Sequence, residues 1–302
     1  MADTSDDLLA GLPVRWETFL DIPPAEALPA TARVVVIPAP YDSTTSYKGG
    51  ARHAPRAIIT ASRQLEDYDI ELDRDISAIG IHTTAEIEPD VSGPKAVVAQ
   101  MRRAVHSVAT RGKLVALLGG EHTITVGAVQ ALREVYPALS VLYLDAHADL
   151  RDKYMGTGWG HASVARRVHE MCPLVQVGVR SLSEEERDFI REVRTPVIFW
   201  TPPRPAMDEV ADKVLESLSG DVYVSIDLDV LDPSVMSAVG TPEPGGMSWD
   251  EVVGLLRKVA EQRRIVGFDI TELSPAEGPE ACAFTAAKLA YKLMGYATMR
   301  PN

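Results

Sequence analysis

Three side chains of the kind that bind metals follow the apolar segment Val141–Leu144 at alternate positions: Asp145, His147 and Asp149. Alternate residues of an extended chain point to the same side, so these groups can converge just beyond the end of a buried strand. Aspartates at a strand end often do no more than begin a turn. Turn formation explains one aspartate but not three potential ligands in phase, so we interpret this stretch as part of a metal site.

Two other apolar segments end in the same residue types. His122 follows Lys113–Leu118 and a pair of glycines, and Asp227 and Asp229 follow Val222–Ile226. A single histidine after a strand is more often structural than a ligand. Open α/β sheets, however, bind their ligands at the carboxyl ends of the strands. We therefore expect one crevice to hold His122, Asp145, His147, Asp149, Asp227 and Asp229.

Four carboxylates and two imidazoles in one crevice need cations to balance their charge. Two divalent ions supply that balance, and a carboxylate-rich site suits Mn²⁺ better than Zn²⁺. Two such ions about 3.5–4 Å apart can share a water molecule and activate it as a nucleophile. The sequence therefore predicts two Mn²⁺ ions per chain and metal-activated hydrolysis.

The segments that must position these residues alternate between strands and helices. Strands are expected at Arg33–Pro38, Ile76–Ile81, Lys113–Leu118, Val141–Leu144, Leu174–Val179, Pro196–Phe199, Val222–Ile226 and Ile265–Phe268. Helices are expected at residues 55–65, Pro94–Thr110, residues 125–135, Ser163–Glu170, Glu184–Arg194, Met207–Leu218, Trp249–Gln262 and Pro279–Met299. This alternation predicts an α/β fold with a parallel sheet covered by helices on both faces.

The chain of 302 residues fits one large α/β domain preceded by an arm. Residues 1–30 are interrupted by four prolines, and Trp16 and Phe19 could anchor them on the body or on a neighbouring subunit. Residues 31–302 are expected to form the single catalytic domain. Within it, the polar and glycine-rich loop Pro40–Pro55 is long enough to suggest a functional role.

The composition limits the partners of this protein. Lys and Arg number 30 and Asp and Glu number 43, which gives a formal charge of −13. Such a protein repels nucleic acid and anionic lipid and attracts metal ions and cationic small molecules. No segment is long and apolar enough to span a membrane, and the acidic start (Asp3, Asp6, Asp7) is unlike a signal peptide. With Cys172 and Cys282 outside any CxxC pair, a cytoplasmic location is expected.

Three motifs resemble the signatures of the ureohydrolase, or arginase/agmatinase, family. They are Gly119–His122, Asp145–Asp149 and Ser225–Pro233, and the similarity extends from about Val34 to the last helix. The resemblance implies a three-layer α/β/α sandwich around an eight-stranded, mostly parallel sheet, two Mn²⁺ ions, and a trimer or hexamer. It further implies that His122 and Asp149 bind one ion, that His147 and Asp229 bind the other, and that Asp145 and Asp227 bridge both.

The same resemblance assigns catalytic roles. His161 matches a proton-shuttle histidine, expected to have a pKa near neutrality, and Glu272 matches a carboxylate that pairs with a guanidinium group. Asp149 would also steer the attacking water. Alone, His161 would be interpreted as a surface histidine beside a helix, and Glu272 as a surface glutamate. The implied reaction releases urea and an amine from a cationic guanidino compound.

Within the family, the segment Trp16–Leu20 and the loop Pro40–Pro55 resemble the agmatinase branch, which converts agmatine to putrescine in polyamine biosynthesis. Aminopropylagmatine ureohydrolase is an alternative. Guanidinobutyrase and formimidoylglutamase are two more, and their carboxylate substrates would need a basic residue. The candidates for that residue are Lys48, Arg52, Arg151 and Lys153.

Arginase activity is less favoured because loop 150–160 contains no Asn or Ser and a single Thr157. In addition, Ser181-Leu182-Ser183 stands where arginases resemble one another in an Asp-x-Asp sequence. We expect three other residues of the loop to form an apolar wall along a methylene chain, namely Tyr154, Met155 and Trp159.

Three interpretations outside this activity fit less well. A zinc deacetylase of related fold typically carries a His-His pair, which this sequence lacks. A non-enzymatic ureohydrolase-like protein usually loses ligands, and all six are present here. A dinucleotide-binding fold is disfavoured because no GxGxxG follows a strand, and Gly156–Gly160 comes after the metal-ligand motif.

Overall fold

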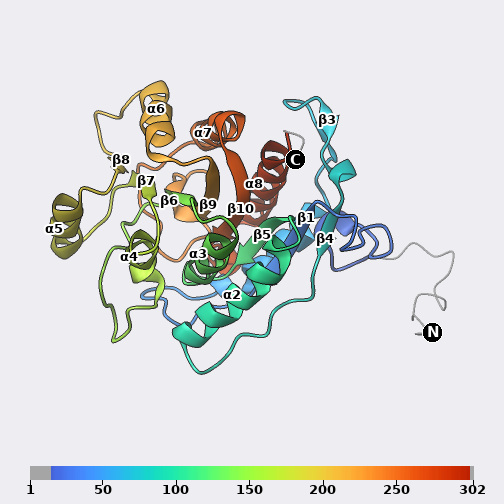
Figure 1. Ribbon diagram of the computed structural model, residues 1–302, viewed down its shortest axis with the longest axis horizontal. Helices are drawn as coiled ribbons and strands as arrows, with labels where there is room; N and C mark the ends of the chain where they lie inside the picture. Colours follow the sequence, from blue (N-terminus) through green and yellow to red (C-terminus); the bar gives the residue numbers. More distant parts are fainter. Residues whose placement is uncertain (1–14, 300–302) are drawn as a thin grey trace.

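The computed structural model describes residues 15–299 and contains one eight-stranded sheet in which every neighbouring pair is parallel. The strand order is β4-β1-β5-β10-β9-β6-β7-β8 (Figure 1). The bounds are β1 (Val34–Ala39), β4 (Ile81–Thr83), β5 (Leu114–Gly119), β6 (Ser140–Leu144), β7 (Leu174–Val179), β8 (Val197–Phe199), β9 (Asp221–Asp227) and β10 (Arg264–Thr271). The predicted α/β sheet is confirmed.

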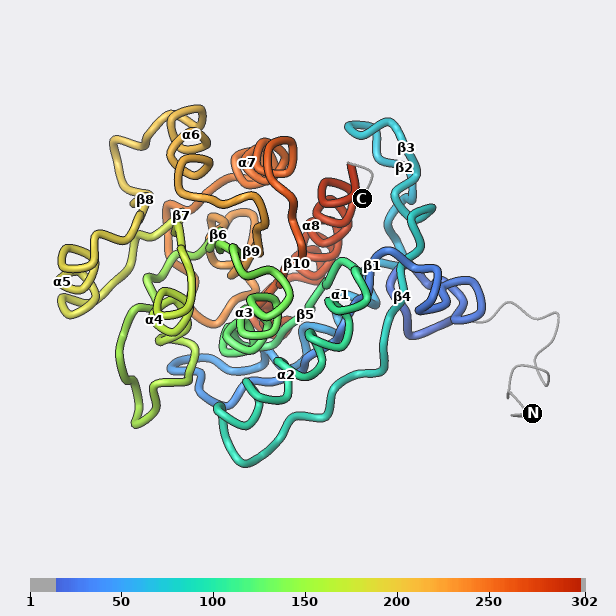
Figure 2. The backbone as a smooth tube through the Cα atoms, in the orientation of Figure 1, coloured from blue at the N-terminus to red at the C-terminus, as the bar shows by residue number. Residues whose placement is uncertain are grey.

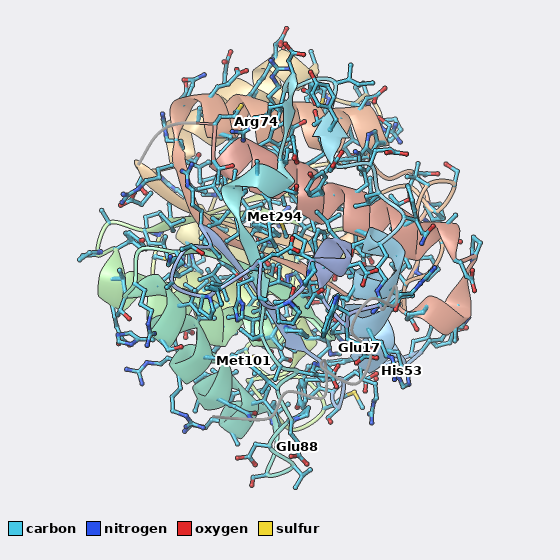
Figure 3. All side chains as sticks on the ribbon, turned by 90° about the vertical axis from the view of Figure 1, so that its right-hand side faces the viewer. Glu17, His53, Arg74, Glu88, Met101 and Met294 are labelled. Atoms are coloured by element: carbon cyan, nitrogen blue, oxygen red, sulfur yellow. The ribbon has the colours of Figure 1, made fainter. Side chains whose placement is uncertain are left out.

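Eight α-helices of the described chain cover the two faces of this sheet (Figures 1 and 2). On one face α1, α6, α7 and α8 share a core, to which α8 contributes Met294. On the other face α2, α3 and α4 share a second core that includes Met101 of α2 (Figure 3). Phe189 and Ile190 of α5 pack at the margin of this core. The bounds are α1 (Ala54–Ser62), α2 (Pro94–Ala109), α3 (Ile124–Val135), α4 (Val164–His169), α5 (Glu184–Val193), α6 (Met207–Ser217), α7 (Trp249–Gln262) and α8 (Ala281–Ala297).

The central strands are buried on both faces, which is why their sequences are continuous apolar runs rather than alternating ones. Every residue of β5 and of β6 is buried. Each fully buried Val, Leu or Ile side chain contributes about 1.5–3 kcal/mol relative to exposure. The strand ends that carry polar side chains are therefore held by the most strongly stabilised part of the fold.

One expected strand, Ile76–Ile81, is misplaced in the sequence analysis. The chain forms a 3-10 turn at Ser77–Ile79 and begins β4 only at Ile81. Gly80 lies between them with φ of +77°, a conformation that interrupts an extended strand. The apolar character of Ile76 reflects its burial under α8, where Tyr291 accepts a hydrogen bond from the Ser77 amide at 2.9 Å.

The described part of the arm packs on the body. Phe19 is fully buried, and its amide donates to Thr83 Oγ1 at 2.9 Å, while the Leu20 amide donates to Ser62 Oγ at 2.9 Å. Trp16 accepts a hydrogen bond from Arg63 through its carbonyl oxygen. Residues 1–14, including the acidic start noted above, lie outside the described chain. Within residues 15–299, no helix combines the length and apolarity needed to cross a membrane.

An ion-pair network ties a small hairpin, β2 (Tyr68–Asp69) and β3 (Arg74–Asp75), to the C-terminal helix. Lys292 of α8 contacts Asp69 at 3.0 Å and also pairs with Glu71. Glu71 accepts further hydrogen bonds from Tyr296 and Arg257, each at 2.7 Å. Partial burial raises the pKa of Glu71, but these hydrogen bonds, led by that of Lys292, outweigh it and lower the pKa to about 2.

Glu71→Gln should lower the free energy of unfolding at neutral pH by about 2 kcal/mol, because the native protein stabilises the ionised carboxylate. The advantage of the wild type is fully present above the ordinary pKa of 4.5 and disappears as the pH falls through about 2. Urea denaturation at neutral pH and at steps below pH 4.5 measures it.

Glu261→Gln is a matched control, since it removes a more exposed partner of the same Arg257. It should cost less than about 0.5 kcal/mol. The difference in the free energy of unfolding between wild type and Glu71→Gln should be smaller at about pH 3 than at neutral pH. An equal difference at both pH values would contradict the ion-pair account.

Candidate metal centre

Four adjacent strands in the middle of the sheet carry the predicted site residues: β5, β9 and β6 supply the metal ligands, and β10 supplies Glu272. The strands β5, β10, β9 and β6 are neighbours in that order, and their carboxyl ends lie at one edge. His122 follows β5, Glu272 follows β10, Asp227 ends β9 and Asp145 follows β6. Residues far apart in sequence therefore meet because their strands are hydrogen-bonded to one another.

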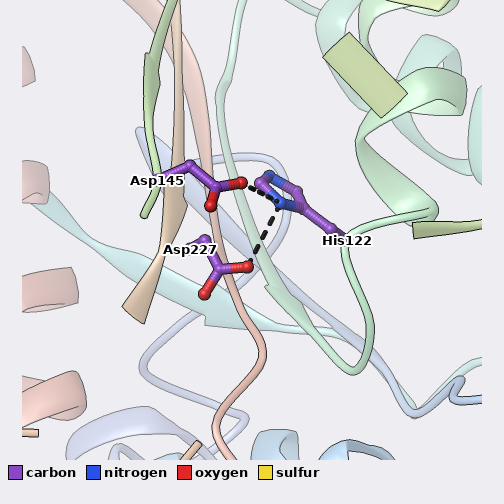
Figure 4. A group of neighbouring side chains, drawn as sticks. All are labelled: His122, Asp145 and Asp227. Carbon is purple, nitrogen blue, oxygen red and sulfur yellow. Dashed lines mark ion pairs between the residues drawn. The ribbon is translucent and has the colours of Figure 1, made fainter. Parts of the chain in front are cut away.

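His122, Asp145 and Asp227 form a first group of potential ligands (Figure 4). The Nδ1 atom of His122 lies 3.2 Å from Asp145 Oδ2 and 3.4 Å from Asp227 Oδ2. Asp149 approaches the same nitrogen, with its Oδ2 atom at 3.5 Å. Three carboxylates thus surround one imidazole nitrogen.

Asp145, His147 and Asp229 form a second group. The Nδ1 atom of His147 lies 2.8 Å from Asp229 Oδ2 and 3.6 Å from Asp145 Oδ1. Asp145 belongs to both groups, as a bridging ligand must, whereas Asp227 appears only with His122. The structure therefore brings all six predicted ligands into one crevice.

The crevice concentrates negative charge away from water. The four aspartates are at most 6% exposed, and their ion pairs within residues 15–299 are with imidazoles. Burial raises the pKa of Asp149 and of Asp227, and the neighbouring carboxylates raise it further. Burial lowers the pKa of His147, but Asp229 and Asp145 more than reverse this effect. A positive charge is therefore favoured at the position where the two groups meet.

The donor set fits metal ions for two structural reasons. Asp145 Oδ2 is buried and has no hydrogen-bond partner, although a buried carboxylate oxygen normally has one. His122 Nε2 lies 2.8 Å from Ser225 Oγ, and the proton of that hydroxyl goes to Asp269. The imidazole must then donate from Nε2, so Nδ1 is the nitrogen that faces the carboxylates and that can bind a metal ion once it has lost its proton. Divalent cations satisfy these acceptors together.

A second layer of side chains holds the ligands, and the sequence analysis did not identify it. Asp269 is fully buried and accepts hydrogen bonds from Ser225, Thr125 and Tyr223 at 2.7–2.8 Å. The signal available in the sequence was a polar residue inside an otherwise apolar strand. Such supporting hydrogen bonds orient metal ligands and increase their affinity.

Tyr143 supports the ligands from the opposite side of His122. Its ring stacks on the imidazole with centroids 4.5 Å apart, and its hydroxyl donates to Asp149 Oδ2 at 2.8 Å. Tyr143 is part of the apolar run before Asp145, so the sequence analysis treated it only as a strand residue. It fixes Asp149 beside His122.

Asp149 and Glu272 both have left-handed backbone conformations, with φ of 51° and 65°. Non-glycine residues rarely adopt this conformation, and it is concentrated at functional sites. The Glu272 amide donates to Gly120 O at 2.9 Å, and its carboxylate accepts from the His122 amide at 2.7 Å. Burial, followed by the charge of Glu121, raises the pKa of Glu272 to about 8. These contacts hold the carboxylate beside the metal ligands.

A cavity of about 230 Å³ adjoins the crevice. The predicted site residues in its lining are His147, Asp149, His161, Asp227 and Glu272. Burial and then the charges of His147 and His122 lower the pKa of His161 to about 4. These neighbours favour the neutral form of His161 in the metal-free protein.

Only part of the expected apolar wall lies in this cavity. Tyr154 lines it, whereas Met155 is 68% exposed and Trp159 lies outside the lining, beside Lys95. The sequence could not show that the loop turns at Met155 and Gly156.

Of the four basic residues that could receive a substrate carboxylate, two line the cavity and two do not. Arg151 and Lys48 line the cavity, whereas Arg52 pairs with Asp42 and Lys153 lies outside the lining. Arg151 lies over the Tyr154 ring at 4.9 Å. Lys48 pairs with Glu277.

Comparison with known proteins agrees with this geometry. The profile of the Arginase family matches residues 32–295. The N(1)-aminopropylagmatine ureohydrolase of Synechocystis is 40% identical over 276 residues, which cover 88% of this chain and 90% of the relative. An enzyme of the same name from Thermus thermophilus is 42% identical and covers 87% and 90%. The agmatinase of Pyrococcus horikoshii is 38% identical and covers 87% and 92%.

Solved structures show the same fold. The agmatine ureohydrolase of Thermoplasma volcanium superposes with a TM-score of 0.86 at 31% identity, covering 98% of each chain. The arginase of Bacillus cereus superposes with a TM-score of 0.74 at 27% identity, covering 87% of this chain and 98% of that one.

Divalent cations should stabilise the wild type, and Asp145→Asn should abolish that effect. At a cation concentration about 100-fold above Kd, binding adds about 2.7 kcal/mol to the free energy of unfolding. The variant keeps the side-chain volume but removes the carboxylate that both ligand groups share. Calorimetric melting with Mn²⁺, Zn²⁺ or Mg²⁺ added separately to chelator-treated protein measures the gain.

His161→Ala provides the control, because it alters the same cavity without removing a proposed ligand. It should keep the full cation-dependent stabilisation. An equal gain for Asp145→Asn and wild type would show that the cations bind elsewhere.

Proposed function

Since the chain belongs to the Arginase family, we propose that it is a ureohydrolase that hydrolyses agmatine, or agmatine extended by an aminopropyl group, to urea and an amine. One observation carries this proposal. The proposed proton carrier His161 and the proposed guanidinium-binding residue Glu272 line one cavity. The same cavity is lined by three of the proposed metal ligands, His147, Asp149 and Asp227. The product of agmatine would be putrescine, an amine of polyamine biosynthesis.

Two Mn²⁺ ions are the proposed cofactor. His122 and Asp149 would hold one, His147 and Asp229 the other, and Asp145 and Asp227 would bridge them. The support is the oxygen-rich donor set, the membership of Asp145 in both ligand groups, and its buried Oδ2 atom, which has no hydrogen-bond partner. Bound there, the ions would supply Lewis-acid polarisation and an activated water.

Glu272 is proposed to bind the guanidinium group of the substrate. Its carboxylate is oriented by the hydrogen bond from the His122 amide at 2.7 Å. A guanidinium in the cavity favours the ionised form of Glu272 and offers it two parallel N–H donors. This contact fixes the plane of the substrate carbon that is attacked.

Asp149 and His161 would handle the protons of the reaction. Asp149 accepts a hydrogen bond from the attacking water, and Tyr143 holds it in place by donating to its Oδ2 atom. Addition of water to the guanidinium carbon gives a tetrahedral intermediate, and cleavage of a C–N bond then forms urea. His161 delivers a proton to the leaving amine nitrogen, as a general acid that must first receive one.

The far part of the cavity suits a substrate without an α-carboxylate and α-amino pair. Ser181 and Ser183 line it where arginases are expected to carry aspartates, and Tyr154 offers an aromatic face to a methylene chain or an ammonium group. The aminopropyl-extended substrate is the second candidate, because relatives with 40% and 42% identity are named for it.

We further propose a homotrimer or homohexamer in the cytoplasm. The assembly rests on the family resemblance stated above. The location is supported by Cys172 and Cys282, which are both buried free thiols, as is usual in a reducing compartment.

Agmatine or N1-aminopropylagmatine should be hydrolysed with a kcat/KM at least about 100-fold above that for arginine. The cations that line this cavity, Arg151 and Lys48, are already paired with Glu186 and Glu277. An α-carboxylate would lose its hydration and have to displace these partners, at a cost of about 1–3 kcal/mol or more. Steady-state urea release over a matched panel measures the ratio. Equal or higher kcat/KM for arginine would defeat the assignment, and a preference for 4-guanidinobutyrate would indicate that Arg151 receives a carboxylate.

His161→Ala should lower kcat for the preferred substrate by about 10²–10⁴-fold, the usual contribution of general acid–base catalysis. KM and metal content should remain near wild-type values, because His161 is proposed to act on protons. Metal analysis of the same preparations supplies the control. Loss of metal together with activity would place His161 among the ligands and overturn its role.

A further inference from the structure

Thr44 joins a buried carboxylate to the catalytic-site histidine. Its hydroxyl oxygen lies 2.6 Å from Glu121 Oε1 and 3.2 Å from His161 Nδ1. The same oxygen accepts a hydrogen bond from the backbone amide of His161 at 3.0 Å. A threonine in the loop after β1 thus contacts both residues, although it is 117 residues away from His161 in sequence.

Glu121 determines the direction of these hydrogen bonds. It is fully buried, and its Oε2 atom accepts the backbone amides of Ser43 and Thr44, both at 2.7 Å. Its Oε1 atom accepts the hydroxyl protons of Thr44 and Thr123. Burial raises the pKa of Glu121, whereas the four donors around it act in the opposite direction. Because all four point at its oxygens, the carboxylate serves only as an acceptor, and the single hydroxyl proton of Thr44 is committed to Glu121.

Both acceptor lone pairs of the Thr44 hydroxyl are then left for His161. A hydroxyl has one proton and two acceptor lone pairs. The backbone amide of His161 takes one lone pair, so the contact with Nδ1 requires Nδ1 to be the donor. Neutral His161 therefore carries its proton on Nδ1 and leaves Nε2 as the basic nitrogen available to the cavity.

The packing around Thr44 restricts it to this position. A Cβ atom on Gly160 would lie 2.9 Å from Thr44 Oγ1 and 3.1 Å from its Cβ atom, so glycine alone permits this approach. The loop is also joined to the end of β5, where the Glu121 amide donates to Tyr41 O at 2.6 Å. Thr44 is thus held rigidly on both sides.

We propose that Thr44 and Glu121 are positioning residues for the ureohydrolase reaction, which fix the Nδ1–H tautomer of His161 and aim its Nε2 atom at the leaving amine. This inference rests on the proposed function. It assigns a catalytic purpose to the loop Pro40–Pro55 that the motif resemblance does not supply. The alternative is that the chain of contacts only attaches that loop to the body.

Thr44→Val and Thr44→Ser separate these roles. Valine preserves the shape but removes the hydroxyl, whereas serine keeps it. Thr44→Val should lower kcat by about 10–100-fold, as loss of an orienting hydrogen bond does elsewhere, with KM within about threefold and metal content unchanged. Thr44→Ser should restore kcat to within about threefold of wild type. Equal losses in both variants, or a loss confined to KM, would overturn the proposal.

A double-mutant comparison isolates the path through His161. In a His161→Ala background, Thr44→Val should cause no further fall in kcat, because the residue that it positions is absent. An additional fall as large as that in the wild-type background would mean that Thr44 acts through the loop instead.

The tautomer can be observed without catalysis. Two-bond ¹H–¹⁵N spectra of histidine-labelled protein loaded with diamagnetic Zn²⁺ distinguish Nδ1–H from Nε2–H, and His161→Ala identifies the signal. Wild type should show the Nδ1–H form, and Thr44→Val should lose it. An Nε2–H form in wild type would overturn the proposal even if urea release is confirmed. Absence of urea release from every guanidino compound would refute the function, while the spectrum still decides the tautomer.

Discussion

The burial of four aspartates around two histidines is the constraint on which this structure depends. Carboxylates that are at most 6% exposed cannot all remain ionised unless nearby cations neutralise their charge. In the metal-free protein the imidazoles provide positive charge, and Asp145 retains a buried oxygen atom without a hydrogen-bond partner. The crevice is therefore electrostatically incomplete by itself, and divalent metal ions complete it.

The charged groups are held at the ends of strands that are buried on both faces. Three of the central strands, β5, β6 and β9, supply the ligands, and the layer of Ser225, Asp269 and Tyr143 fixes their orientation. The strained backbone of Asp149 and Glu272 is maintained by the same contacts. The loops that carry Arg151, Tyr154 and Ser181 line the cavity beside the metal ligands, and we propose that they select the substrate.

The sequence predicted well the features that repeat along the chain. Apolar runs indicated the strands, and alternate polar positions after them indicated which groups share a side, as for Asp145, His147 and Asp149. Contacts between distant segments were not predictable in this way. Thr44 meets His161 only because the loop after β1 folds over the end of β5. The expected roles of Met155 and Trp159 and the start of β4 failed because they depend on local turns, at Gly156 and Gly80, that periodicity does not reveal.

The most direct test of this account is to locate the metals. Crystals grown with Mn²⁺ and measured at the manganese absorption edge should show two anomalous peaks per chain, about 3.5–4 Å apart. Both peaks should contact Asp145, with His122 beside one and His147 beside the other. A single peak, or peaks away from the ends of β5, β6 and β9, would contradict the account that buried carboxylates create a two-metal hydrolytic site.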